Sequence, residues 1–129
     1  MSNEITVRFS GRVLNGNMDE SFGPGQVQID QSVQGRGGHV QEIGTTEEAL
    51  DFGDIGIGTI NVEGYLYIRN LDASNYITYG PQVGTGSMEV VGKLKAGGEF
   101  AWLRLYPGVV ILAKADTAAC KLDVRLYAD

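Results

Sequence analysis

The chain has 129 residues, a hydrophobic fraction of 43% and a formal net charge of −6. This length suits one domain with its own core, and the composition is that of a folded protein rather than a disordered one. The ten Lys and Arg residues are scattered along an acidic chain, so we expect no binding to nucleic acid.

No apolar run approaches the roughly 20 residues that a membrane-spanning helix needs, so we expect no membrane partner. The segment Met1–Ile5 lacks the basic and apolar regions of a secretory signal, which predicts synthesis in a cytoplasm. Cys120 is the single cysteine and fits a reducing compartment. We expect it to be a small packing residue.

Alternating apolar and polar residues predict a first strand at Ile5–Phe9, continued past a bulge at Gly11 by Val13-Leu14. Asn15-Gly16 is a strong signal for a two-residue hairpin turn, with a longer loop as the alternative. Phe22–Gly25 has the composition of a loop. A second strand is predicted around Val27 and Ile29.

A flexible turn at Gly35–Gly38 and a short strand at His39–Ile43 are expected next. Residues 45–52 permit two interpretations, a helical turn capped by Thr45 or Thr46 and an extended connection. The glycine-interrupted stretch Asp54–Ile60 is interpreted as a loop or an edge strand.

The centre of the chain, Gly64–Gly80, shows the clearest pattern. Tyr65, Tyr67 and Arg69 alternate with apolar residues, as in a strand whose two faces meet different surroundings. Asn70–Asn75 then breaks the run with side chains that favour turns, and Tyr76–Tyr79 resumes a strand. This order predicts a hairpin-like pair.

Four segments after Gly80 also have the composition of strands: Ser87–Leu94, Glu99–Tyr106, Val109–Lys114 and Leu122–Tyr127. Glu99–Tyr106 carries apolar residues on both parities. It is therefore expected to be buried on both faces, or to place one face in the core and the other in a protein interface.

Eight or nine short strands with little helix predict an all-β protein. We expect one antiparallel β-sandwich domain over residues 1–129, arranged like a jelly roll.

The sequence offers no recognisable catalytic or cofactor-binding set. His39 is the only histidine, so one chain cannot form a histidine-based metal cluster. A group of carboxylates invites comparison with a calcium site, but its spacing does not match an EF-hand loop. This group comprises Glu47, Glu48, Asp51 and Asp54. We expect no metal, no cofactor and no enzymatic activity.

Aromatic residues and one arginine are the candidate interface residues. The candidates are Tyr65, Tyr67, Trp102, Arg104 and Tyr106. Cross-strand packing is the first interpretation of the aromatic residues, a protein interface the second, and sugar stacking the third.

Several stretches of the second half of the chain resemble small virion proteins of tailed bacteriophages. The residues that carry the resemblance are Gly64–Ile77, with its Asn-Leu-Asp-Ala-Ser-Asn-Tyr turn, Leu94–Phe100, Arg104-Leu105 and Pro107-Gly108. An extra glycine separates Ala96-Gly97 from Glu99, which is a small departure from the pattern of that group.

This resemblance implies a non-enzymatic β-sandwich component of a phage particle, made in the host bacterial cytoplasm. The acidic composition favours an outer position, such as a capsid decoration protein, over one that lines the DNA-filled interior. The expected partners are other copies of the chain and virion proteins such as the major capsid protein. A tail or collar component and a carbohydrate-binding sandwich are the alternatives, and a small hydrolase is the weakest.

Overall fold

The computed structural model describes residues 3–31, 35–52, 63–84 and 86–128. The chain divides into two compact units, Met1–Ser32 and Val33–Asp129. The described residues are all-β, and every strand pair is antiparallel. They contain no helix, and hence none that is able to cross a membrane. The stretch Asp54–Ile60 lies outside the described residues.

The first unit is one long hairpin, in which β1 (Ile5–Asn15) pairs with β2 (Met18–Ile29). A two-residue turn is confirmed, but it consists of Gly16-Asn17 rather than Asn15-Gly16, because Asn15 still pairs with Met18. Gly16 has φ +59°, a conformation that glycine adopts without strain. The predicted loop at Phe22–Gly25 is wrong, because these residues continue β2. The pairing shifts register there, so that Phe9 faces Gly25 while Gly11 faces Phe22.

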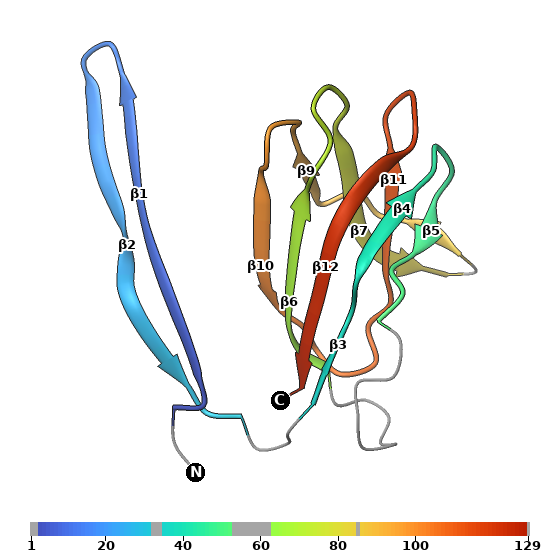
Figure 1. The fold of residues 1–129 in the computed structure, drawn as a ribbon, viewed down its shortest axis with the longest axis horizontal. Helices are drawn as coiled ribbons and strands as arrows, with labels where there is room; N and C mark the ends of the chain where they lie inside the picture. Colours follow the sequence, from blue (N-terminus) through green and yellow to red (C-terminus); the bar gives the residue numbers. More distant parts are fainter. Residues whose placement is uncertain (1–2, 32–34, 53–62, 85, 129) are drawn as a thin grey trace. The chain divides into compact units, whose positions relative to one another are not determined.

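The second unit is a sandwich of two five-stranded sheets, and the hairpin contributes no strand to either (Figure 1). Sheet I has the order β10-β6-β12-β3, with β4 also paired to β12. Its strands are β3 (Arg36–Gly37), β4 (Val40–Ile43), β6 (Glu63–Asn70), β10 (Phe100–Arg104) and β12 (Cys120–Ala128).

Sheet II has the order β5-β11-β7-β8, with β9 also paired to β7. Its strands are β5 (Glu48–Ala49), β7 (Ile77–Val83), β8 (Ser87–Met88), β9 (Gly92–Leu94) and β11 (Ile111–Ala115). The sandwich expected over residues 1–129 is thus formed by Val33–Asp129, while the first unit forms its own sheet.

The inward parity of the strands builds the core. On β12 the fully buried Leu122, Val124 and Leu126 alternate with outward residues, and Leu66 and Ile68 of β6 pack in the same cluster. Cys120 belongs to this core, as expected. Burial raises the pKa of its thiol above the ordinary value, so the group behaves as a small apolar residue.

Most connections cross from one sheet to the other. The prediction of a hairpin at Gly64–Gly80 is wrong, because β6 belongs to sheet I and β7 to sheet II. The segment between them, residues 71–76, is therefore an arch over the end of the sandwich. The passages from β9 to β10 and from β11 to β12 cross at the same end (Figure 1).

Three further expectations are tested. The turn expected at Gly35–Gly38 contains β3, which pairs with the end of β12. Residues 45–52 contain a bend at Thr45-Thr46 followed by β5, and no helix, so the helical turn is wrong. Strand β7 also continues through Gly80-Pro81, beyond the strand predicted at Tyr76–Tyr79.

Asn70 connects two of these crossings, the arch between β6 and β7 and the passage from β9 to β10. It is fully buried, and its side-chain amide donates to the carbonyls of Asn75, at 2.9 Å, and Leu94, at 3.0 Å. Its Oδ1 accepts the backbone N–H of Asp72 at 2.9 Å. Its own N–H donates to the carbonyl of Glu99. The turn that carries the virion resemblance is thus hydrogen-bonded, through Asn70, to the segment between β9 and β10.

Asp72 stabilises the arch from within. Its Oδ2 accepts the backbone N–H groups of Asn75, at 2.7 Å, and Ser74, at 3.0 Å. These bonds favour the ionised carboxylate and lower the pKa of Asp72 below the ordinary 3.8.

We expect Asp72→Ala to lower Tm by about 3–6 °C at neutral pH, because two backbone N–H groups lose their acceptor. Since the pKa is lower in the folded state, the contribution of Asp72 is fully present above the ordinary value of 3.8 and is lost as pH falls through the lowered value. Thermal unfolding of both proteins from pH 7 to pH 2 measures this. Asp72→Asn, which keeps an amide oxygen, is the control and should show a smaller, pH-independent loss.

Candidate interaction surfaces

The outer side of sheet I carries a patch that we call the aromatic face. Adjacent strands β10, β6 and β12 each contribute three outward residues, and the pairing registers align them in three rows. The rows are Phe100–Arg69–Asp123, Trp102–Tyr67–Arg125 and Arg104–Tyr65–Tyr127. Five aromatic rings and three guanidinium groups therefore share one surface with one carboxylate.

Diagonal contacts between β6 and β10 fix the rings. Tyr65 stacks on Trp102 with ring centroids 5.3 Å apart and planes 12° from parallel. The guanidinium of Arg104 lies over the Tyr65 ring, 4.7 Å from its centroid, and donates to the Tyr65 hydroxyl. Tyr67 and Phe100 form a tilted pair at 6.1 Å. The cross-strand packing interpretation is confirmed for these rings.

This packing makes the Tyr65 ring unavailable for sugar stacking. Tyr65 is only 7% exposed, and Trp102 and Arg104 already lie against its ring. A shallow recess of about 320 Å³ remains beside Tyr67 and Phe100, where Arg69 donates from Nε to the Gly98 carbonyl at 3.1 Å. The face offers edges, hydroxyls and guanidinium groups, which is the composition of protein contact surfaces.

Four of the five candidate interface residues gather on the aromatic face, namely Tyr65, Tyr67, Trp102 and Arg104. Tyr106 does not belong to its rows; it follows the end of β10 and is 81% exposed. Sequence reasoning missed five members: Phe100, Arg69, Asp123, Arg125 and Tyr127. The alternation along β12 could have placed Arg125 and Tyr127 on one side of that strand. The residues beside them on β6 and β10 became known only with the strand order.

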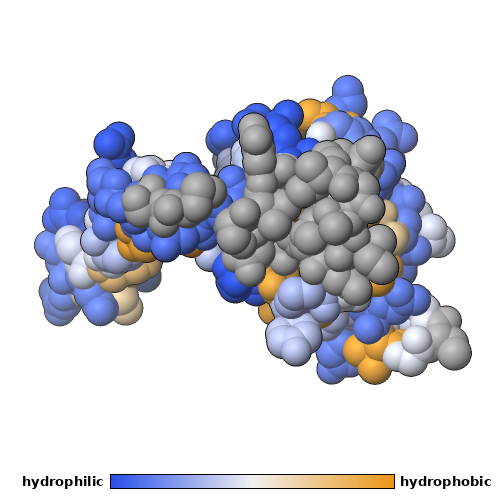
Figure 2. Space-filling view, turned by 90° about the horizontal axis from the view of Figure 1, so that it is seen from below, coloured by the Kyte–Doolittle hydropathy of each residue, from blue (hydrophilic) through white to orange (hydrophobic). Residues whose placement is uncertain are grey.

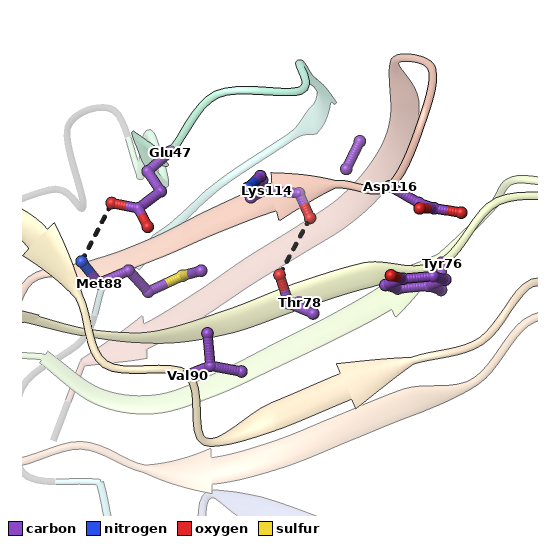
Figure 3. Close-up of a pocket in the computed structure, with 8 residues that line it drawn as sticks. Glu47, Tyr76, Thr78, Met88, Val90, Lys114 and Asp116 are labelled. Atoms are coloured by element: carbon purple, nitrogen blue, oxygen red, sulfur yellow. Dashed lines mark hydrogen bonds between the residues drawn. The ribbon is translucent and has the colours of Figure 1, made fainter.

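A second hollow, of about 430 Å³, lies on sheet II (Figure 3). Its rim carries Glu47, Lys114 and Asp116, with Glu47 and Asp116 at opposite ends of the view. Glu47 accepts the backbone N–H of Met88 at 3.1 Å, and the Thr78 hydroxyl donates to the Lys114 carbonyl at 3.4 Å. The first bond holds β8 to the segment before β5, and the second joins β7 to β11, so these polar groups stabilise the sheet rather than converge on one point.

The described residues contain no group of three or more His, Cys, Asp or Glu side chains arranged to hold a metal ion. Glu47 and Glu48 of the acidic stretch instead accept backbone N–H groups, from Met88 and Gly44 respectively. Asp54 lies outside the described residues. His39 has its backbone carbonyl bonded to the N–H of Val124.

The hairpin unit carries a third surface, which we call the apolar face. Its two strands pair so that eight apolar side chains fall on one side of the ribbon: Ile5, Val7, Phe9, Val13, Met18, Phe22, Val27 and Ile29. Figure 2 shows hydrophobic residues gathered along one side of this unit. Polar residues dominate the other side, where Arg12 pairs with Asp19 at 2.9 Å.

Two glycines make room for the aromatic rings of the apolar face. The Phe22 ring lies over Gly11, at the place where any other residue would carry its Cβ. Phe9 likewise lies against Gly23 and packs on Phe22, with ring centroids 5.8 Å apart. The two rings therefore form a continuous apolar centre, with aliphatic residues on both sides of it along the ribbon.

Sequence reasoning missed the apolar face because the register shift hides it. On β2 the apolar residues occupy even positions before the shift, at Met18 and Phe22, and odd positions after it, at Val27 and Ile29. A search for strict alternation finds only the second pair. The clue was the composition of Gly23-Pro24-Gly25, in which glycine and proline mark a bulge as readily as a loop.

No family model, no curated protein and no solved structure matches this chain. The function must therefore be inferred from the fold and its surfaces.

Proposed function

We propose that this protein is a non-enzymatic structural component of a tailed-phage virion, most simply a decoration protein on the head surface. The observation that supports this function best is the apolar face. Five of its side chains remain open to solvent, with exposed fractions between 37% and 52%. A surface of this kind serves protein contact, because contiguous apolar patches on soluble proteins mark interaction sites.

The second unit supports the same proposal. Its aromatic face is rich in Tyr, Trp and Arg, the residues enriched at contact hot spots. In the larger of the two recesses described above, the Thr78 hydroxyl bonds to the Lys114 main-chain carbonyl rather than to a basic side chain. The resemblance of Gly64–Ile77 and the following stretches to small virion proteins is the reason for proposing that the particle is a tailed-phage virion. A tail or collar position is the near alternative.

Particle localisation tests this proposal. Antibodies against the protein are applied to particles purified from a lysate of a tailed phage that carries this coding sequence, and the particles are viewed by electron microscopy. We expect labels at regular positions on the head. Particles from a phage with the coding sequence interrupted are the control and should remain unlabelled.

Labels on the tail or collar would instead assign the protein to that part of the virion. A protein that stays entirely in the soluble fraction of the lysate, with unlabelled particles, would contradict a structural role in the virion.

A further inference from the structure

We propose that the apolar face of the hairpin packs against the apolar face of a second copy of this chain. This inference rests on the proposed structural function and names the contact that such a role requires. It concerns one surface of the first unit and needs no contribution from the aromatic face.

The hairpin needs a second layer. A two-stranded ribbon is at best marginally stable in water, and a stable sheet needs three or more strands or a packed face. None of the described residues of the first unit forms a second layer over the apolar face. Two ribbons that pack face to face, about 10 Å apart, make the smallest two-layered β structure.

The character of the apolar face selects another apolar face as its partner. Glu20 is the single ionisable residue whose pairing register places it on this side, and it lies near the turn. A charged or strongly polar partner would leave its own groups without hydrogen bonds against this surface. A second copy presents the same uncharged centre of Phe9 and Phe22, and an isologous contact brings the same patch of both copies together.

The accessible area agrees with pairing. From the exposed fractions, the apolar face offers roughly 500 Å² of accessible surface, so two copies together bury about 1,000 Å². Specific interfaces start at about this size. We therefore expect a reversible association whose extent depends on protein concentration.

Adjacent residues on opposite faces of the ribbon provide matched variants. Val13→Lys adds a charge to the apolar face, while Leu14→Lys adds the same charge to the other side. Each new lysine would lie across from a carboxylate, Glu20 or Asp19, so both variants retain a folded ribbon. Val27→Lys and Gln28→Lys repeat the comparison near the other end of the face.

Light scattering after size exclusion, over a wide concentration range, measures the association of the full chain and its variants. We expect the parent protein to associate, and Val13→Lys and Val27→Lys to weaken the association at least tenfold. The Leu14→Lys and Gln28→Lys controls should behave as the parent. Association should persist or strengthen as salt is raised, because the contact is apolar and the net charge of −6 opposes it.

Hydrogen exchange of the amides of Ile5–Ile29 supplies a second measurement. Their protection should rise with concentration in the parent and the controls, and stay low in the two apolar-face variants.

Three results would overturn the pairing. Association that is unchanged in both apolar-face variants would assign it to another surface. A strictly monomeric parent with a protected hairpin would show that the chain covers its own apolar face. A monomeric parent with an unprotected hairpin would require a different protein as the partner. None of these results bears on the particle localisation, which tests the proposed function separately.

Discussion

Replacing Asn70 by Asp should destabilise the sandwich by about 3–5 kcal/mol at neutral pH. Asn70 is fully buried, and its amide nitrogen donates to two carbonyls, those of Asn75 and Leu94. A carboxylate of nearly the same shape would face the same two oxygens without a proton to share. Denaturant unfolding followed by the fluorescence of Trp102, the only tryptophan, measures the loss.

The loss should depend on pH in a defined direction. Burial against two carbonyls would raise the folded-state pKa of the new aspartate, so the unfolded chain would release its proton at a lower pH than the folded one. The destabilisation should therefore be smallest below pH 4 and grow as pH rises through the unfolded-state pKa of about 3.9. A loss that is independent of pH would contradict the assigned hydrogen bonds.

Asn75→Asp is the matched control for this experiment. It makes the same chemical change in the same arch, but the Asn75 side chain accepts a hydrogen bond from the Thr117 hydroxyl at 3.0 Å. A carboxylate can accept that bond equally well, but it cannot donate to the Asp72 carboxylate, whose pKa the Asn75 side chain helps to lower. We therefore expect a loss of about 1 kcal/mol, well below that of Asn70→Asp.

Gly80→Ala should cost about 2–4 kcal/mol, because the new methyl group would collide with the main chain. Gly80 is buried in the middle of β7, beside the break between β8 and β9. There the backbone of Glu89 and Val91 approaches closely: their N–H groups donate to the carbonyls of Pro81 and Tyr79, each at 3.0 Å. The Glu89 carbonyl occupies the place of a Cβ at Gly80.

Thermal unfolding of Gly80→Ala tests this close approach, with Gly44→Ala as the control. A methyl group on Gly44 would enter open space, with no heavy atom of the described structure within 4 Å apart from its chain neighbours, and the φ of Gly44 is not positive. The control should therefore change stability by no more than about 0.5 kcal/mol. Equal stability of the two variants would show that the β8–β9 segment moves aside without cost.

The strand pattern of the sandwich was predictable, whereas its pairing was not. Alternation along β12 and β6 identified both strands and their buried sides, because one face of each meets the core. The same alternation cannot say which sheet a strand joins. Asn70–Asn75 has the composition of a hairpin turn, but its polar side chains satisfy an arch between sheets instead.

For the candidate surfaces, too, the sequence indicated residue types but not the pairing that brings them together. Tyr65, Tyr67, Trp102 and Arg104 were candidates because residue type alone favours interfaces. Their meeting on one face required the pairing of β10 with β6, two strands that lie far apart along the chain. The apolar face escaped prediction for a local reason, since one shift of register exchanged the two sides of β2.

The position of β12 affects the order in which the protein folds. This strand lies between β6 and both β3 and β4 in sheet I, yet it is synthesised after all of them. The sandwich therefore cannot close until β12 has emerged from the ribosome, and its non-local pairings fold on the slow time scale of sandwiches, roughly milliseconds to seconds. The hairpin, with its local pairing, emerges first and forms within about 1–10 μs. Nascent chains on one polysome can thus present complete hairpins before any sandwich is finished.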